Sequence, residues 1–246
     1  MARPRIALVI PTLNEEEAIG GVISAVPLGA VDDIIVVDSG SADCTVERAR
    51  AAGARIVSLR ERGYGRACRV GAEAAQDCDI IAFLDGDGSD CPELIPRLIE
   101  PIVEDRSDFV IGSRTRGKRE PGSMTAHQLV AGRVIGAAVG LLYGTHYTDM
   151  CPFRAIRRDL LMRLGMREET YGWNLEMQMR AARAGLRIAE LPVTHRRRTG
   201  GASKVSGNLR GTVRASWRIL ATFVRIAAEG RERRRGTVPP AGRHFR

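Results

Sequence analysis

Two aspartates, Asp85 and Asp87, stand one glycine apart directly after a run of apolar residues, 80–84. Such a short run is typical of a buried strand in a parallel sheet. The carboxylates would then lie at the carboxyl end of that strand, where open α/β sheets bind their ligands. Two carboxylates this close repel each other unless a cation lies between them, and Mg²⁺ accepts carboxylates together with phosphate oxygens of a substrate. The spacing therefore predicts a metal–diphosphate site, with a solvated acidic turn as the alternative.

The surrounding sequence alternates between short apolar runs and helical spacing. Strands are expected at residues 5–10, 34–37, 55–59, 80–84 and 109–112, with helices between them. This alternation predicts an α/β fold with a mostly parallel sheet flanked by helices on both faces. Three of the strands end in turns rich in Asn, Asp, Ser and Gly, which also favour loops and helix caps. Because these turns would meet at one edge of the sheet, we expect a pocket there.

The net charge of +9 is concentrated at the C-terminal end. Residues 196–246 contain 14 Lys and Arg against 2 Asp and Glu, a local charge of +12, so residues 1–195 sum to −3. A neutral to acidic body with a basic end is suited to anionic lipid, nucleic acid or an anionic substrate. The five cysteines are scattered and form no C-x-x-C pair, so we expect neither disulfides nor a zinc site. A reducing cytoplasm is the expected location.

Two segments bear on membrane association. Residues 129–143 are apolar but interrupted by Arg133, and they are shorter than the roughly 20 residues that a bilayer requires. With no signal peptide expected at the N-terminus, we predict that the chain does not cross a membrane. Residues 211–229 show apolar residues at helical spacing with arginines elsewhere around the axis, which is typical of a basic amphipathic helix on an anionic membrane surface. Packing against the body of the protein is the alternative.

One glycine motif does not indicate a dinucleotide site. Gly63 and Gly65 have the spacing that begins a dinucleotide-binding fingerprint, but Cys68 occupies the third glycine position. The motif also follows the third expected strand, whereas the fingerprint follows the first. We therefore reject a Rossmann dehydrogenase.

Four motifs occur in a fixed order: P-T-L-N-E-E at 11–16, V-V-D-S-G-S-A-D at 36–43, G-Y-G-R-A at 63–67 and L-D-G-D at 84–87. Their order and spacing resemble family 2 glycosyltransferases with the GT-A fold. C-P-F-R-A at 151–155 and R-R-R-T-G-G-A-S-K at 196–204 resemble the dolichyl-phosphate, or polyprenyl-phosphate, sugar synthase branch. The resemblance covers about residues 4–228. We expect three parts: a catalytic domain at 1–205, a basic amphipathic helix at 206–230 that is packed on it or appended to it, and a basic tail at 231–246 whose composition predicts disorder.

The resemblance implies roles for the matched positions. The residues expected to bind the nucleotide sugar are Pro11, Leu13, Asn14, Glu15, Asp38, Ser39, Arg66, Asp85, Gly86, Asp87 and Arg114. Asp38 would bond the base, and Arg66 lies in the loop expected to close over the nucleotide. Asp85 and Asp87 would hold Mg²⁺ or Mn²⁺ against the diphosphate. Ser89 stands where many relatives have a glutamine ligand. Its hydroxyl is a shorter and weaker third ligand, and a water or Asp90 is the alternative for completing the metal shell.

The type of acceptor decides whether a catalytic base is needed. A sugar hydroxyl must lose its proton to a carboxylate, whereas a phosphate monoester is already anionic near neutral pH. Family members that use hydroxyl acceptors resemble one another in an acidic pair followed by Gln-x-x-Arg-Trp. Residues 172–178 read G-W-N-L-E-M-Q, and no Arg-Trp follows the glutamine, which favours a phosphate acceptor. The residues expected to bind that phosphate are Arg114, Arg196, Arg198, Ser203 and Lys204.

The expected catalytic residues are Asp87, Asp149, Glu176 and Arg198. Glu176 has three possible roles: a base, a sugar-binding carboxylate, or the partner of Arg180 four residues later on a helix. Asp149 is expected to contact the donor sugar or the acceptor, or only to form a turn. Glycines 200 and 201 precede the last two phosphate-binding positions, and they predict a mobile loop that orders over the substrate, with a solvated basic loop as the alternative.

We therefore predict an inverting, metal-dependent glycosyltransferase. It would move a hexose from a UDP-glucose or GDP-mannose type donor to a polyprenyl or dolichyl phosphate, at the cytoplasmic face of a membrane. One alternative is a soluble transferase with a hydroxyl acceptor, in which Glu176 or Asp149 is the base. The other is a nucleic-acid-binding protein. It is disfavoured because the basic segment lacks the interleaved aromatic residues of a single-strand platform and because it leaves the acidic pair unexplained.

Overall fold

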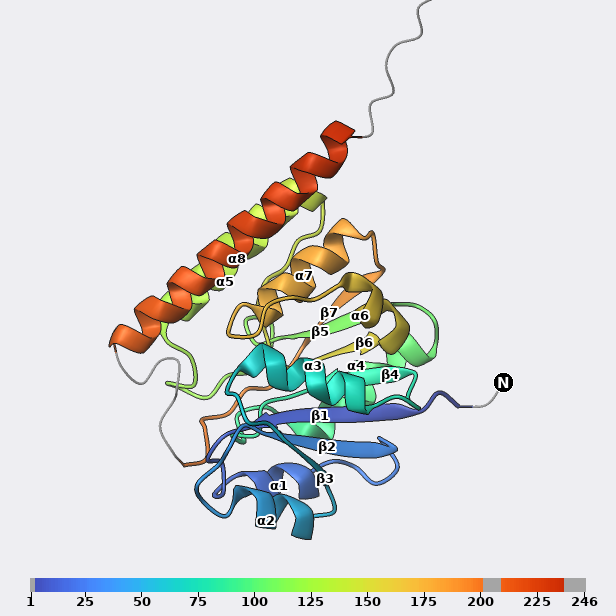
Figure 1. The fold of residues 1–246 in the computed structure, drawn as a ribbon, viewed down its shortest axis with the longest axis vertical. Coiled ribbons are helices and arrows are strands. Elements are labelled where there is room, and N and C mark those ends of the chain that lie inside the picture. Colours follow the sequence, from blue (N-terminus) through green and yellow to red (C-terminus); the bar gives the residue numbers. More distant parts are fainter. Residues whose placement is uncertain (1–2, 201–208, 237–246) are drawn as a thin grey trace, which may run out of the picture.

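A computed structural model describes residues 3–200 and 209–236 of the chain. It contains a seven-stranded sheet in the order β3-β2-β1-β4-β6-β5-β7, flanked by helices (Figure 1). The strands are β1 (Ile6–Thr12), β2 (Asp33–Asp38), β3 (Arg55–Ser58), β4 (Ile80–Phe83), β5 (Phe109–Ser113), β6 (Arg154–Arg157) and β7 (Ile188–Pro192). The helices are α1 (Ile19–Ser24), α2 (Thr45–Ala51), α3 (Tyr64–Ala74), α4 (Ile95–Val103), α5 (Ala126–Tyr143), α6 (Arg158–Leu164), α7 (Trp173–Arg183) and α8 (Leu209–Gly236), with a short 3₁₀ helix, Pro92–Leu94, before α4. The predicted α/β class and mostly parallel sheet are confirmed.

The centre of the sheet is apolar and closed to solvent. β1 pairs in parallel with β2 on one side and with β4 on the other, and all four residues of β4 are buried. Strands covered on both faces are continuous apolar runs, which is why these strands are visible in the sequence. β3 and β7 lie at the two edges and are partly exposed. The acidic turn therefore follows a strand in the rigid middle of the sheet.

β6 is a strand that the sequence does not predict. It runs antiparallel to β4 and β5 and is inserted between them. Its first residue, Arg154, is fully buried; it donates from Nε to the carbonyl of Cys151 and from Nη1 to that of Asn174, each at 3.0 Å, and lies over the Phe109 ring. A charged residue satisfied by backbone carbonyls interrupts the apolar pattern by which strands are recognised. The C-P-F-R-A motif is thus buried, and its arginine joins β6 to the backbone at Cys151 and Asn174.

The C-terminal helix is longer than expected. α8 extends from Leu209 to Gly236, so the boundary predicted at residue 230 lies inside a helix. The predicted boundary between 205 and 206 falls within residues 201–208, and the remainder of the predicted tail, 237–246, also lies outside the described residues. α5 and α8 both contact α7, and they lie on the side of the molecule away from β1–β3 (Figure 1).

α5 is packed on one face and exposed on the other. A Cβ at Gly136 would lie 1.9 Å from the carbonyl oxygen of Tyr147, so the helix sits directly on that backbone. On the opposite face, Val130, Val134 and Leu141 are 60%, 62% and 89% exposed. α5 is 18 residues long and, among the described residues, it is the helix whose length and apolar composition would suffice to cross a membrane.

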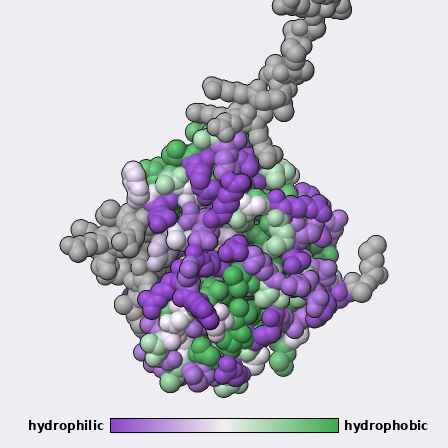
Figure 2. Space-filling view, viewed as in Figure 1, coloured by the Kyte–Doolittle hydropathy of each residue, from purple (hydrophilic) through white to green (hydrophobic). Residues whose placement is uncertain are grey.

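α8 repeats this arrangement. Its Ile226 is fully buried, whereas Trp217, Leu220 and Val224 are 70%, 53% and 57% exposed. In Figure 2 apolar residues appear in green at the upper left, where α8 lies in the same view. The predicted alternative of packing therefore holds for one face of each helix, and each helix also carries an outward apolar stripe.

Candidate active site

The turns that follow β1 and β2 are bonded to each other. The Asn14 side-chain oxygen accepts a hydrogen bond from the amide of Ala42, and the Asn14 amide donates to the hydroxyl of Ser41, both at 2.9 Å. The amide of Glu15 donates to the hydroxyl of Thr45 at 2.8 Å. Asn14 has a left-handed backbone, with φ of 52°, which asparagine tolerates better than most residues. The predicted meeting of these turns at the sheet edge is confirmed.

Asp38 shapes the second of these turns. Its carboxylate, buried at the end of β2, accepts hydrogen bonds from the amides of Gly40 and Ser41 at 3.0 and 3.1 Å, and from the Ser41 hydroxyl at 2.5 Å. The amide of Ser39 donates to the carbonyl of Thr12 at 3.0 Å. Asp38 therefore fixes the turn after β2, and its bond to a nucleotide base stays a prediction, as do the contacts of its neighbours with the nucleotide sugar.

Pro11, Leu13 and Gly86 line the same edge. Pro11 lies in β1 opposite Val37, and Leu13 begins the turn that follows β1. A Cβ at Gly86 would lie 2.8 Å from the Thr12 side chain. Glycine is therefore required for the turn after β4 to pack against the end of β1.

Asp85 is the carboxylate with an unmet requirement. Its Oδ1 is buried and has no hydrogen-bond partner in the described part of the chain, and its amide donates to Asp90 Oδ2 at 3.2 Å. Burial, and next the negative charges of Asp87 and Asp90, raise the pKa of Asp85 well above its usual range. A buried, unpaired oxygen beside two further carboxylates is a site where a cation would stabilise the ionised form.

Asp87 is held in place by its own turn. Its Oδ1 accepts hydrogen bonds from the amide and the hydroxyl of Ser89 at 2.9 and 2.6 Å. The predicted third ligand, Ser89, thus orients Asp87, and its direct contact with a metal stays a prediction. Asp87 Oδ2 accepts from Nη1 of Arg198 at 3.2 Å.

The oxygens of Asp85 and Asp87 suit a hard divalent cation. Across residues 3–200 and 209–236, no group of three or more His, Cys, Asp or Glu side chains is placed to hold a metal ion. Mg²⁺ commonly binds to one or two carboxylates and takes its other ligands from water and substrate phosphates. The residues present therefore fit a cation that is held jointly by the protein and a diphosphate.

A basic segment crosses the acidic turn. The amides of Arg196 and Thr199 donate to the carbonyls of Ser89 and Asp87 at 2.8 and 2.9 Å. The structure thus brings two of the predicted phosphate-binding arginines, 196 and 198, to the site. The Arg196 side chain, 44% exposed, is paired with Glu93. The other two predicted positions, Ser203 and Lys204, lie outside the described residues.

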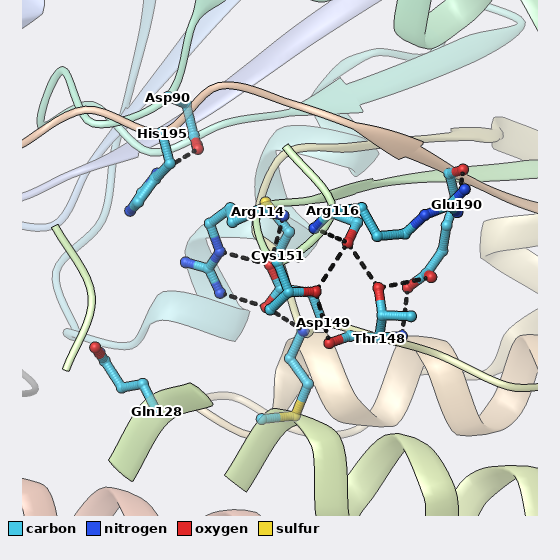
Figure 3. Close-up of polar contacts among 12 residues, drawn as sticks. Asp90, Arg114, Arg116, Gln128, Thr148, Asp149, Cys151, Glu190 and His195 are labelled. Carbon is cyan, nitrogen blue, oxygen red and sulfur yellow. Dashed lines mark hydrogen bonds and ion pairs between the residues drawn. The ribbon is translucent and has the colours of Figure 1, made fainter. Parts of the chain in front are cut away.

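His195 belongs to the site although it is absent from the predicted residues. It is 4% exposed, and its Nδ1 lies 3.6 Å from Oδ1 of Asp90, which is equally buried (Figure 3). Neither atom has a hydrogen-bond partner among the described residues. The one signal in the sequence is a histidine directly before three arginines, which gives no sign of burial.

Asp149 is engaged by Arg114 from the end of β5. The carboxylate accepts from Nε and Nη2 of Arg114, both at 2.8 Å, from the Arg114 amide at 2.9 Å and from the Met150 amide at 2.7 Å (Figure 3). Burial alone would raise the pKa of Asp149, but the bonds and charge of Arg114 outweigh it and hold the pKa below its usual range. Asp149 is thus a poor proton acceptor that positions Arg114, and the structure speaks against its predicted role as a base.

The loops that carry Arg114 and Asp149 are themselves fixed. Glu190 on β7 accepts hydrogen bonds from the amide and hydroxyl of Thr148 at 2.8 and 2.9 Å, and the Thr148 hydroxyl lies 2.6 Å from that of Ser113 (Figure 3). Burial raises the pKa of Glu190. The arginine–aspartate pair is therefore held by two strands, β5 and β7, and by the loop that carries Thr148, which are distant in the sequence.

Glu176 is enclosed in the interior. It is fully buried, and its Oε2 accepts from the amides of Arg167 and Glu168 at 2.9 and 2.6 Å. Its Oε1 accepts from Arg180 at 2.9 Å and from Arg225 of α8 at 3.3 Å. A base must present an accessible oxygen to its substrate, and Glu176 presents none. Of its three predicted roles, Glu176 therefore fills that of ion-pair partner of Arg180. Its predicted role as a catalytic base is wrong, because the carboxylate is closed to substrate.

The G-Y-G-R-A loop owes its glycines to packing. A Cβ at Gly63 or Gly65 would lie 2.4 or 2.3 Å from a backbone oxygen of Glu169 or Glu168. The Arg66 side chain is paired with the carboxylates of Glu61 and Glu169. Its closure over a nucleotide stays a prediction.

The fold is of the GT-A type. A crystal structure of glucosyl-3-phosphoglycerate synthase from Mycobacterium tuberculosis, in complex with Mn²⁺, UDP-glucose and phosphoglyceric acid, superposes with a TM-score of 0.74. It is 27% identical and covers 92% of this chain and 80% of its own.

Residues 7–165 match the family Glycosyl transferase family 2, and the chain belongs to this family. An uncharacterised glycosyltransferase of Mycobacterium bovis is 36% identical over 228 residues, which cover 90% of this chain and 100% of the relative. An undecaprenyl-phosphate mannosyltransferase of Micrococcus luteus is 35% identical over 228 residues, which cover 84% of this chain and 90% of the relative. The family resemblance seen in the motifs is confirmed, and the protein is a glycosyltransferase.

Proposed function

We propose that this glycosyltransferase moves a hexose from a nucleoside diphosphate sugar to a polyprenyl phosphate. The observation that carries the proposal is the state of the two carboxylates that could act as a base. Glu176 is fully buried, and Asp149 is bonded on both oxygens to Arg114. A hydroxyl acceptor needs such a base, whereas a phosphate monoester reacts as the anion it already is. Arginines rather than carboxylates therefore serve the acceptor.

The donor would bind at the carboxyl ends of β1, β2 and β4. Asp85 and Asp87 would hold Mg²⁺ or Mn²⁺, which supplies Lewis-acid stabilisation of the departing diphosphate. The buried, unpaired oxygen of Asp85 supports this assignment. Glu15 and Asp38 shape the nucleoside side of the pocket, and Asp149 holds Arg114 so that its guanidinium can orient a phosphate.

A lipid acceptor is supported by the outer surface. Exposed apolar side chains on α5 and α8 include Val134, Leu141 and Trp217, and Arg218, which follows Trp217 on α8, is also exposed. Apolar and aromatic residues next to basic ones suit the interface of an anionic membrane. We infer that the protein lies on the cytoplasmic face of a membrane through this surface, which the name of the Micrococcus luteus relative also favours.

A soluble, phosphorylated acceptor is the second candidate. It is favoured by the structural likeness to glucosyl-3-phosphoglycerate synthase. The two candidates are separated by one assay: the full chain is incubated with Mn²⁺, UDP-glucose or GDP-mannose, and either undecaprenyl phosphate or 3-phosphoglycerate. We expect a radiolabelled sugar to enter the organic phase only with the lipid acceptor. Transfer to 3-phosphoglycerate alone would overturn the proposal in favour of the second candidate.

Membrane association gives a separate prediction. We expect the protein to float with phosphatidylglycerol-containing vesicles at low salt. Replacing Trp217 and Leu141 by alanine should weaken partitioning onto the vesicles by about tenfold or more, because two large apolar side chains are no longer transferred from water into the membrane interface. Leu28→Ala, at a fully exposed apolar residue outside α5 and α8, is the matched control and should float like the wild type. Equal flotation of all three proteins would exclude these stripes as the membrane surface.

A further inference from the structure

Arg198 joins two parts of the site that are otherwise separate. Its Nη2 donates to both carboxylate oxygens of Glu15, after β1, and its Nη1 donates to Asp87 Oδ2, after β4, at 3.2 Å. The three side chains are only 20%, 9% and 17% exposed. One positive charge is therefore shared by two poorly solvated carboxylates, which leaves a net negative charge.

The backbone beside Arg198 is fitted to the acidic turn. We call residues 195–200 the strap, because amides within it donate to the carbonyls of Ser89 and Asp87. Two glycines permit this contact: a Cβ at Gly88 would lie 2.7 Å from the hydroxyl of Thr199, and Gly200 has a φ of +76°, which favours glycine. The strap lies over the turn that carries the metal-type carboxylates.

We propose that Arg198 binds Oδ2 of Asp87 in place of the divalent cation until the donor binds. Arg198 is then released and binds the acceptor phosphate. Asp87 Oδ1 is taken by Ser89, so Oδ2 is the oxygen for which Arg198 and a cation compete. Arg198 gives this oxygen a single hydrogen bond at 3.2 Å, whereas a divalent ion brings twice the charge at shorter range.

Release of Arg198 makes binding of the acceptor depend on prior binding of the donor. While it is bound to Glu15 and Asp87, its guanidinium fork is not available to a phosphate. Arrival of the donor with its cation displaces Arg198, and the strap then offers it to the acceptor, so the donor binds first. This second half rests on the proposed function, and the competition at Asp87 does not.

The competition is tested by Mn²⁺ binding to the full chain without nucleotide, measured from the electron paramagnetic resonance signal of free Mn²⁺. Arg198→Gln should bind Mn²⁺ roughly three- to tenfold more tightly than the wild type, because an ion pair of this kind no longer opposes the metal. Arg197→Gln is the matched control: it removes the same charge one residue away, where Nε donates to the carbonyl of Pro121 at 2.6 Å. It should stay within about twofold of the wild type, because an exposed charge acts weakly at a distance.

Three results would overturn the proposal: Arg198→Gln binds Mn²⁺ no more tightly than the wild type, both variants gain equally, or none of the proteins binds Mn²⁺. Arg198→Lys keeps the charge without the fork, so its affinity should lie between those of the wild type and Arg198→Gln. The proposed function is judged separately by the lipid-linked product. Product formation with unchanged Mn²⁺ affinity rejects only the role of Arg198, and tighter Mn²⁺ binding without product rejects only the polyprenyl phosphate acceptor.

Discussion

Asp87→Asn should lower the rate of sugar transfer by about a thousandfold or more, because a metal-held diphosphate accounts for several kcal/mol of transition-state stabilisation. The substitution keeps the size of the side chain and the Oδ1 bond from Ser89, but it removes the charge at the end of β4. The measurement is the initial rate with saturating Mn²⁺ and nucleotide sugar, together with the melting temperature. The rate should fall without a comparable fall in stability, since the carboxylate is partly exposed and close to other acids.

The control for Asp87 comes from the segment before the same strand, β4. Asp77 is an exposed acid at the opposite end of β4 from the site. Asp77→Asn removes an equal charge, so its rate should remain within about twofold of the wild type, as for other surface substitutions. If Asp87→Asn kept a rate near that of Asp77→Asn, the metal–diphosphate assignment at the end of β4 would be wrong.

The features that the sequence predicts well are those that depend on neighbouring residues, such as apolar runs and turns. β1, β2 and β4 contain uninterrupted apolar runs, and the turns that follow them contain residues suited to caps, so these strands and the meeting of their turns could be foreseen. β6 could not, because its buried arginine is satisfied by carbonyls that the sequence does not bring near. The spacing of residues along the chain predicts the secondary structure of a segment, but it says little about which distant groups will bond to its side chains.

The same limit explains the errors at the candidate bases. Asp149 is bonded to a residue 35 positions earlier, and Glu176 to one 49 positions later. A carboxylate in a motif looks the same in sequence whether it faces a substrate or an arginine. Only the interaction of Glu176 with Arg180, four residues away on one helix, was accessible to sequence reasoning.

The second large effect concerns stability and separates the two roles of Glu176. Glu176→Gln should lower the free energy of unfolding by about 3 kcal/mol or more, because it removes the charge of the fully buried carboxylate that pairs with Arg180 and leaves that arginine only the half-buried Glu229. The glutamine amide must also direct its NH₂ group either at the two backbone amides or at the arginines, all of which are donors. For a chain of this size the melting temperature should fall by about 6–12 °C.

The matched control is Glu73→Gln on α3. Glu73 pairs with Arg69 at the same helical spacing and the same distance, 2.9 Å, as Glu176 with Arg180, but it is 50% exposed. Water replaces such a surface pair at little loss, so its removal should change stability by less than about 1 kcal/mol. Transfer per folded molecule should be retained in both variants at a temperature well below the melting point. The reverse result for Glu176→Gln, an unchanged melting temperature with lost transfer, would restore Glu176 as the base. It would also reopen the hydroxyl acceptor, because the argument for phosphate depends on this carboxylate being closed to substrate.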